Sequence, residues 1–158
     1  MFVVAGTGHR PDKLGGYDSS TYERVFKCAV IALQEQRPDL VISGMALGWD
    51  MALAEAAYAL EIKFKAYVPF EGQESKWPRE SRRLYLALLG KAESVVHVSS
   101  PGYSAQKMWD RNVRMVDDCD LLVALWDGSS GGTSNCLSYA KRAGRTSINY
   151  WDIYQGIK

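Results

Sequence analysis

The sequence has few cysteines and no cysteine motif. Cys28, Cys119 and Cys136 are odd in number and widely spaced, and no two of them form a CxxC pair. This spacing argues against a disulfide framework and against a zinc site. We therefore expect reduced thiols in a cytoplasmic protein, and we expect neither a metal nor a cofactor.

Long apolar runs and an excess of one charge are also absent. No apolar run approaches the roughly 20 residues that a helix needs to cross a bilayer, so we expect no membrane partner. The first residues, MFVVAGTGHRP, lack the basic start and long apolar core of a signal peptide. Nineteen Lys and Arg against eighteen Asp and Glu give a formal charge of +1, which disfavours binding of nucleic acid by bulk electrostatics and leaves open only a local basic patch.

The length and composition predict one globular domain. A chain of 158 residues can bury a sizeable core but is too short for two domains of usual size, so we expect a single domain over residues 1–158. With 47% hydrophobic and 23% charged residues, the composition gives no reason to expect disorder.

Residues 40–58 change physical character twice, from strand to glycine turn to helix. The apolar run of residues 40–42 predicts a buried strand, and Gly44 and Gly48 bracket a tight loop that opens onto an amphipathic helix. The unpaired N–H groups at the start of that helix favour a phosphate or a carboxylate, although Asp50 in the first turn could already occupy this position. An ordinary strand-to-helix turn with a capping acid is the alternative.

The rest of the chain repeats this alternation. We expect further strands at residues 2–5, 64–68, 95–98, 121–126 and 147–151, with residues 121–126 buried on both faces. The expected helices start at a capping box of Ser20 and Glu23, after Trp77 and Pro78, at residue 105 (ending at 118), and at a cap formed by Thr133. Six strands and five helices predict an α/β fold, a Rossmann-like three-layer sandwich with a mostly parallel six-stranded sheet.

Three glycine loops follow strands in this arrangement: GTGHRP at residues 6–11, the loop at residues 44–48, and DGSSGG at residues 127–132. Because ligands of such sheets bind beyond the carboxyl ends of the strands, the three loops should converge on one site. Their convergence is a stronger indication of a ligand site than any one loop alone.

Together, GTGHRP, SGMALGWDMALAEAA and WDRNVRMVDDCDLLVALWDGSSGGT resemble the YpsA-like (DUF1273-type) branch of the SLOG superfamily, which also contains the LOG phosphoribohydrolases and DprA-like proteins. The resemblance covers nearly the whole chain. It implies a Rossmann-like domain whose glycine loops hold a nucleotide or nucleotide-derived ligand, and it implies a homodimer. For this branch it implies no settled reaction.

The LOG enzymes cleave the N-glycosidic bond of a nucleoside monophosphate with an arginine and with the glutamate of a PGGxGTxxE motif. Arg111 stands nine residues before Asp120, as the enzymes' arginine does before their own aspartate, and Gly132 and Thr133 match the GT of the motif. The glutamate position, however, falls on Cys136. A thiol cannot replace the carboxylate, so the resemblance does not simply transfer the LOG activity. The plain expectation for Cys136 is a buried and inert thiol.

Each candidate residue has a functional and a structural interpretation. His9 and Arg10 could face a phosphate or form a structural turn. Arg111 could clamp a phosphate or pair with Asp110 or Asp117 on its own helix, and Trp109 could stack on a base or pack in the core. The expected ligand-binding residues are Gly6, Thr7, Gly8, His9, Arg10, Ser43, Gly44, Gly48, Asp50, Trp109, Asn112, Asp127, Gly128, Gly131, Gly132 and Thr133.

Three hypotheses follow for the function. The leading one is a nucleotide-binding sensor or sequestering module. The second is an enzyme that cuts a nucleotide's N-glycosidic bond, with Asp50, Glu71 and Arg111 as candidate catalytic residues. The third is single-stranded DNA binding of the DprA type through the basic cluster Lys76, Arg79, Arg82 and Arg83, which the near-neutral charge disfavours.

Overall fold

The computed structural model describes all residues from 1 to 158 and is built around one parallel sheet. Its six strands lie in the order β4-β3-β2-β1-β5-β6, and every neighbouring pair is parallel. The strand order reverses between β1 and β5, because the chain first runs outward from β1 to β4 and then returns. The strands are β1 (Val3–Gly8), β2 (Leu40–Ser43), β3 (Lys63–Val68), β4 (Ser94–His97), β5 (Leu121–Leu125) and β6 (Thr146–Asn149).

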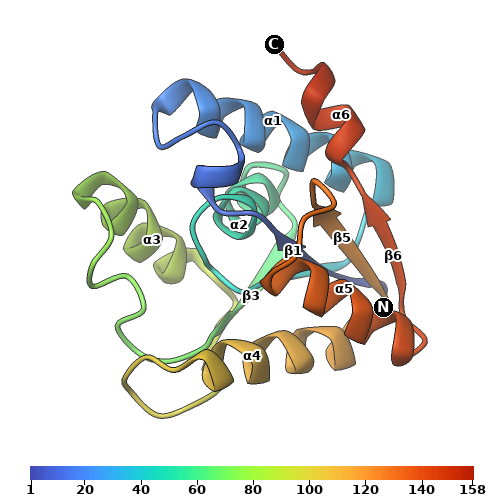
Figure 1. The fold of residues 1–158 in the computed structure, drawn as a ribbon. Helices are drawn as coiled ribbons and strands as arrows, with labels where there is room; N and C mark the ends of the chain where they lie inside the picture. Colours follow the sequence, from blue (N-terminus) through green and yellow to red (C-terminus); the bar gives the residue numbers. More distant parts are fainter.

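Helices cover both faces of the sheet, as Figure 1 shows. The larger core cluster joins one face of the sheet to α1, α2, α3 and α6, and the smaller cluster joins the other face to α4 and α5. This confirms the expected Rossmann-like three-layer α/β sandwich. The helices are α1 (Ser19–Gln36), α2 (Trp49–Ala59), α3 (Arg79–Lys91), α4 (Ala105–Asp118), α5 (Gly132–Arg142) and α6 (Trp151–Gly156), with a short 3-10 helix η1 (Pro11–Lys13) after β1.

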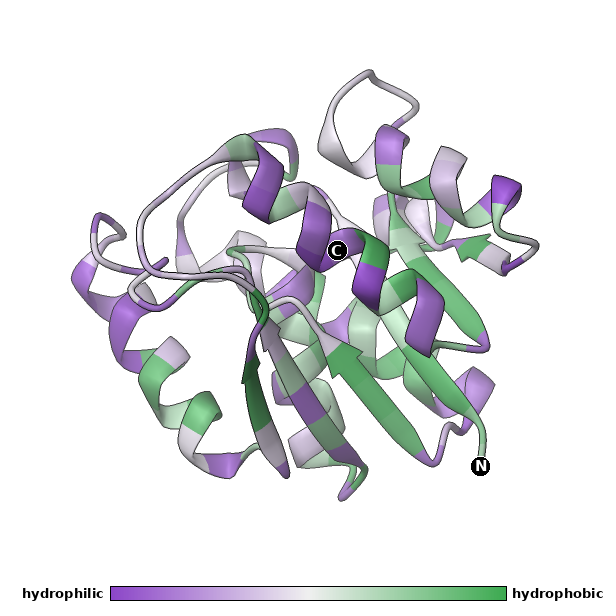
Figure 2. Ribbon diagram, turned by 90° about the horizontal axis from the view of Figure 1, so that it is seen from below, coloured by the Kyte–Doolittle hydropathy of each residue, from purple (hydrophilic) through white to green (hydrophobic).

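Burial explains why the central segments form strands. All five residues of β5 are buried, and so are the first five of β1. This confirms the expected two-sided burial for residues 121–125, whereas Trp126, expected to be the last residue of this strand, lies after it and is partly exposed. The outer strands β4 and β6 are partly exposed. Accordingly, hydrophobic residues dominate the middle of the sheet in Figure 2, whereas the helices alternate between hydrophobic and hydrophilic residues.

Two expected helix caps are wrong. The N-cap of α1 is Asp18, whose Oδ1 accepts hydrogen bonds from the Thr21 N–H at 2.7 Å and from the Ser20 hydroxyl at 2.8 Å. Ser20 therefore lies inside the first turn rather than at its cap. The N-cap of α5 is Gly131, whose φ of 140° lets the chain turn into the helix, so Thr133 lies inside the helix and is buried.

Two strand boundaries also differ from the expectation. β1 continues to Gly8 instead of ending at Ala5, because its pairing with β5 extends to Gly8 opposite Leu125. β6 ends at Asn149, whose side-chain oxygen accepts the Trp151 N–H at 3.2 Å. The residues that follow form α6, a sixth helix that was not expected, and its first residue, Trp151, had been assigned to the strand of residues 147–151.

Gly8 should be intolerant of any side chain because Trp49 lies against it. A Cβ added at Gly8 would lie 2.5 Å from Trp49 Cδ1, whereas a Cβ at Gly90 in α3 would meet nothing within 4 Å. We expect Gly8→Ala to lower the free energy of unfolding by about 1–3 kcal/mol through overpacking. The control Gly90→Ala should raise it by up to about 1 kcal/mol through helix propensity. Urea denaturation of both variants tests this, and an equally stable Gly8→Ala would contradict it.

Candidate functional site

A polar cleft of about 550 Å³ lies beyond the carboxyl ends of the strands. Residues that follow β1, β2 and β5 line it together with side chains of α4, so it lies at the point where the strand order reverses. Its volume is typical of small-molecule sites. The lining residues are Thr7, Gly8, His9, Arg10, Asp12, Lys13, Ala46, Asp50, Tyr103, Ala105, Met108, Trp109, Arg111, Asn112, Gly131, Gly132, Thr133 and Asn135.

Arg111 and Asp50 are buried charges of opposite sign in this cleft. They are 4% and 6% exposed. The guanidinium donates from Nη1 to the carbonyl of Gly44 and from Nε to Asn112 Oδ1 at 2.9 Å. Nη2 has no hydrogen-bond partner within the protein, so it is available to a ligand. Arg111 therefore does not pair with Asp110 or Asp117 on the helix surface.

Gly44 makes this arrangement possible. A Cβ added to it would lie 2.6 Å from Arg111 Nη1 and 2.9 Å from Asp50 Oδ2, so any side chain would enter the space that the two charged groups occupy. Burial raises the pKa of Asp50, while the charge of Arg111 and hydrogen bonding to the backbone at Ala46 oppose this shift. Burial also lowers the pKa of Arg111, and the charge of Asp50 opposes that shift.

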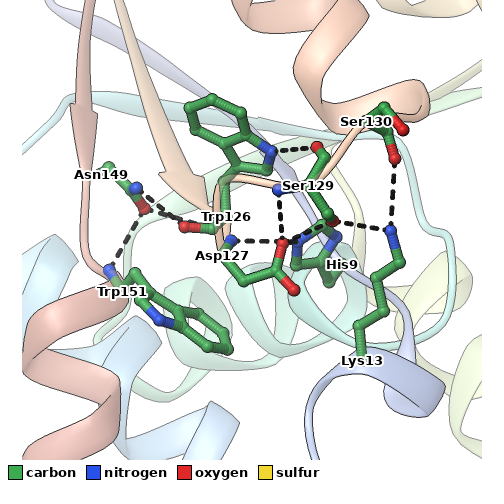
Figure 3. A network of polar contacts seen from close by, with 8 residues as sticks. All are labelled: His9, Lys13, Trp126, Asp127, Ser129, Ser130, Asn149 and Trp151. Carbon is green, nitrogen blue, oxygen red and sulfur yellow. Dashed lines mark hydrogen bonds and ion pairs between the residues drawn. The ribbon is translucent and has the colours of Figure 1, made fainter.

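The third glycine loop is held in place by His9 of the first loop and by Lys13 of η1, as Figure 3 shows. Asp127 Oδ1 lies 2.7 Å from His9 Nε2 and accepts the Ser129 N–H at 2.9 Å. Lys13 donates from Nζ to Ser129 Oγ at 2.8 Å, and Trp126 donates from Nε1 to the Ser129 carbonyl at 2.7 Å. These contacts fix residues 127–130 in one conformation and join the two loops that follow the adjacent strands β1 and β5.

The N-terminus of α5 opens into the cleft. Gly131, Gly132 and Thr133 all line it, and no side chain caps the helix at Gly131. The first backbone N–H groups of this helix are therefore free to bind an anion. Lys13 lies beside them, because a Cβ on Gly131 would be 3.9 Å from its Nζ.

Most of the ligand-binding residues expected from the sequence line this cleft. They are Thr7, Gly8, His9, Arg10, Asp50, Trp109, Asn112, Gly131, Gly132 and Thr133, and the candidate catalytic residue Arg111 lies with them.

Other expected residues lie outside the lining, and three of them support the loops. Gly6 and Gly48 allow close packing, since added Cβ atoms would lie 2.1 Å from Leu53 Cδ1 and 2.5 Å from the His9 carbonyl oxygen respectively. Ser43 donates to the Asp50 carbonyl at 2.7 Å. The remaining members of this group are Gly44, Asp127, Gly128 and the candidate catalytic residue Glu71, which is exposed.

Some lining residues were not expected from the sequence. Lys13 follows the GTGHRP motif by two residues, and the turn of η1 brings it back to the third loop. Because Lys13 is a cation so close in sequence to a glycine loop, it could have been predicted as a ligand-binding residue. Tyr103 and Met108 come from the segment before α4 and its first turn, where no motif marks them. Cys136 is fully buried as expected, and burial raises the pKa of its thiol to about 11.

The structure contains neither a metal-binding cluster of side chains nor a helix that could cross a membrane. No group of three or more His, Cys, Asp or Glu side chains is arranged to hold a metal ion. None of the helices combines the length and the apolar character that crossing a membrane requires.

The fold and the cleft define a Rossmann-like α/β protein with a polar cleft at the switch point of its sheet. Residues 4–153 match the model of the YspA SLOG family, and the chain belongs to this family.

Sequence relatives agree with this assignment. The chain is 34% identical over 117 residues to YoqJ, an uncharacterized SPbeta prophage-derived protein of Bacillus subtilis, which covers 64% of this chain and 68% of that one. It is 31% identical over 147 residues to a UPF0398 protein of Bacillus velezensis, covering 84% and 79% of the two chains. The UPF0398 protein YpsA of Bacillus subtilis is 27% identical over 144 residues, and the alignment covers 84% of this chain and 80% of that one.

Solved structures show the same fold. DNA processing protein A (DprA) of Streptococcus pneumoniae superposes with a TM-score of 0.66 at 21% identity, over 94% of this chain and 50% of that one. The chain thus spans half the length of that protein. DprA of Helicobacter pylori, whose structure concerns its single-stranded DNA binding mode, gives a TM-score of 0.66 at 14% identity, over 94% and 64% of the chains. The structural-genomics target TM1055 gives 0.62 at 14% identity, over 94% and 73%.

The hydrogen bonds that Asp127 accepts should make the stability of the protein depend on pH. Hydrogen bonds from Ser129, with a smaller contribution from His9, hold the pKa of Asp127 well below its usual value of 3.8. The folded state therefore binds this proton more weakly than the unfolded state, so the stabilisation is present above pH 3.8 and is lost as the pH falls below it.

We expect Asp127→Asn to be less stable than the wild type at pH 7 and the difference to shrink towards pH 2.5. Urea denaturation midpoints measured between these pH values test the expectation. Asp152→Asn, a change of the same charge at an exposed residue of α6, should show a constant offset. A difference for Asp127→Asn that does not change with pH would contradict this account.

Proposed function

We propose that this protein binds a nucleotide or nucleotide-derived ligand in the cleft, as a sensor or sequestering module made of one domain. The observation that carries the proposal is the uncapped N-terminus of α5, which faces the cleft beside Lys13. This end of the helix offers free N–H groups and a positive dipole to a phosphate. Arg10 and Arg111 add two further cations to the same cleft.

Other lining residues of the cleft suit a ribose and a base. Asn112 and Asp50 present polar groups that can bind hydroxyls, and Asn112 is already oriented by Arg111. Trp109, Tyr103 and Met108 add apolar and aromatic surface to the lining, and Tyr103 is 75% exposed. Aromatic faces of this kind stack on bases without requiring a particular base. The ligand class therefore combines a phosphate, polar hydroxyls and a flat ring.

Lys13 should contribute to phosphate binding and not to nucleoside binding. Calorimetric titration with a panel of nucleoside monophosphates, cyclic nucleotides and the matching nucleosides tests this. We expect Lys13→Met to weaken binding of the phosphorylated ligand about tenfold, because a charge-assisted hydrogen bond is lost, and to leave nucleoside affinity unchanged. Lys27→Met, which removes an exposed cation of α1, should change neither affinity.

Failure of every nucleotide and nucleotide derivative to bind at micromolar concentration would overturn the proposal. Equal weakening of nucleoside and nucleotide by Lys13→Met would instead show that Lys13 acts only by holding Ser129 and Ser130.

A second function is favoured by Asp50, namely hydrolysis of a nucleotide's N-glycosidic bond. Burial raises the pKa of this carboxyl within the cleft, which is a property of general acids, and Arg111 lies beside it. In this reaction Asp50 delivers its proton to the leaving base as the bond between the base and the anomeric carbon breaks. Water adds to the anomeric carbon, and the proton that the water loses returns Asp50 to its protonated form. Cys136 provides no carboxylate at the position where LOG enzymes have one, so Asp50 would have to supply the acid.

Asp50→Asn separates the two functions. If the protein is a hydrolase, incubation with nucleoside monophosphates releases free base and ribose phosphate, and Asp50→Asn should reduce that release at least 100-fold. Mass spectrometry of the products measures the free base and the ribose phosphate released by the wild type and by Asp50→Asn. Glu71→Gln serves as the control, since Glu71 lies outside the cleft lining. Intact nucleotides after incubation with the wild type would exclude the reaction and leave the binding function.

Single-stranded DNA binding is the least supported function. The likeness to DprA shows the fold alone, and Lys76, Arg79, Arg82 and Arg83 share their exposed segment with Glu80, which lies 3.7 Å from Arg83. Those residues are absent from the cleft lining.

A further inference from the structure

A second cavity of about 310 Å³ lies next to the cleft but is lined by different residues. It is bounded by η1, the start of α1, the start of α2 and the first turns of α3, which lie together on one face of the sheet (Figure 1). The first and second glycine loops border both spaces: Arg10, Asp12 and Ala46 line the cleft, whereas Pro11 and Gly48 line this cavity. Nothing in the proposed function uses it.

The floor of this cavity is apolar. Leu14, Val25, Leu47 and Met51 line it and are between 1% and 7% exposed, and the half-buried Leu84 closes one side. A floor of aliphatic side chains favours an apolar or aromatic body. The volume suits a small molecule rather than a peptide.

The charged residues of the lining are both acidic. Asp18 and Glu80 line the cavity, and no Lys, Arg or His does, although Arg83 outside the lining lies 3.7 Å from Glu80 Oε1. Asp18 uses Oδ1 to cap α1, while Oδ2 has no hydrogen-bond partner and lies 3.9 Å from the position of a Cβ on Gly16, another lining residue. Hydrogen bonds from Thr21 and Ser20 lower the pKa of Asp18, so it is ionised at neutral pH.

Two tyrosine rings complete a setting that favours a cation. Tyr17 lines the cavity and is 60% exposed, and Tyr22 is fixed by the hydrogen bond from its hydroxyl to Glu55 Oε2. Aromatic faces attract ammonium groups. Three helices begin around this cavity, but Asp18 at the N-cap of α1 and Glu80 in the first turn of α3 offset the positive ends of two of them, which would otherwise attract an anion.

We propose that this cavity is a second ligand site, for a small organic amine whose aromatic or apolar body lies on Leu14, Leu47 and Met51 and whose ammonium group lies between Asp18 and Glu80. The site is independent of the nucleotide function proposed for the cleft, and it can be tested without a nucleotide.

Tryptamine, 3-methylindole and indole-3-acetate are suitable probes, because they share one ring system and carry positive, zero and negative charge. We expect calorimetry to show that tryptamine binds at least tenfold more tightly than either of the others. Chemical shifts of the Met51 and Val25 methyl groups should change during the titration, while those of the Met108 methyl group and of the Trp109 indole N–H should not. Tighter binding of indole-3-acetate, shifts confined to the cleft, or no binding of tryptamine at millimolar concentration would each overturn the proposal.

Variants separate recognition by this site from attraction by the protein surface. Asp18→Asn with Glu80→Gln should lower tryptamine affinity about tenfold and leave 3-methylindole unaffected, and Asn at residue 18 keeps the helix cap. Glu35→Gln with Asp152→Asn removes two exposed carboxylates outside the cavity and should leave both affinities unchanged. Ser81→Trp, which fills the cavity from the half-buried side of α3, should abolish binding of both probes. Equal effects of the two charge-removing pairs, or full binding by Ser81→Trp, would contradict the assignment.

Discussion

The cleft depends on the contacts that the buried guanidinium of Arg111 makes. This guanidinium originates on α4, which covers one face of the sheet, and reaches the backbone of the loop that follows β2. A buried charge of this kind is tolerated only where an opposite charge and hydrogen bonds offset its desolvation. Asp50 supplies the charge from α2 on the other face, while Gly44 and Asn112 supply the acceptors. The two helical layers are thereby linked electrostatically through the carboxyl edge of the sheet.

A second link joins the loops that flank the switch point. Main-chain pairing of β1 with β5 brings Gly8 opposite Leu125, and the contact between His9 and Asp127 continues this pairing beyond the last ladder position. Because Lys13 and Ser129 extend the same connection, the cleft is bordered by loops with a defined conformation (Figure 3). Such preorganisation reduces the entropy that a ligand must overcome on binding.

The sequence predicted the architecture well because its pattern is strong. Unbroken apolar runs such as residues 121–125 identify buried parallel strands, and glycine loops after them identify the ligand edge. The helix of residues 105–118 was also placed correctly. Caps were harder, because Asp18 and Ser20 are both good acceptors and only tertiary structure decides where the helix begins. The aromatic residues after Asn149 suit a strand as well as a short helix, so α6 was missed.

Side-chain roles were predictable only where a motif carried them. The sequence indicated that His9 and Asp127 belong near a ligand, but it could not show that they contact each other across 118 positions. In the same way, Gly6 and Gly48 were expected to approach a ligand, whereas they accommodate Leu53 and the His9 carbonyl. A glycine pattern predicts that another group approaches the backbone closely, but it does not predict whether that group is a ligand, a side chain or another backbone segment.

The two glycine loops that border both cavities have a thermodynamic consequence. Within residues 10–12 and 46–48, some residues line the cleft and their neighbours line the second cavity. A displacement of either loop therefore changes the shape of both the cleft and the cavity. Any coupling between occupants of the two spaces must be reciprocal: a factor by which the first alters the affinity of the second equals the factor by which the second alters the first. The loops at residues 10–12 and 46–48 are therefore the parts of the fold through which such a coupling would act.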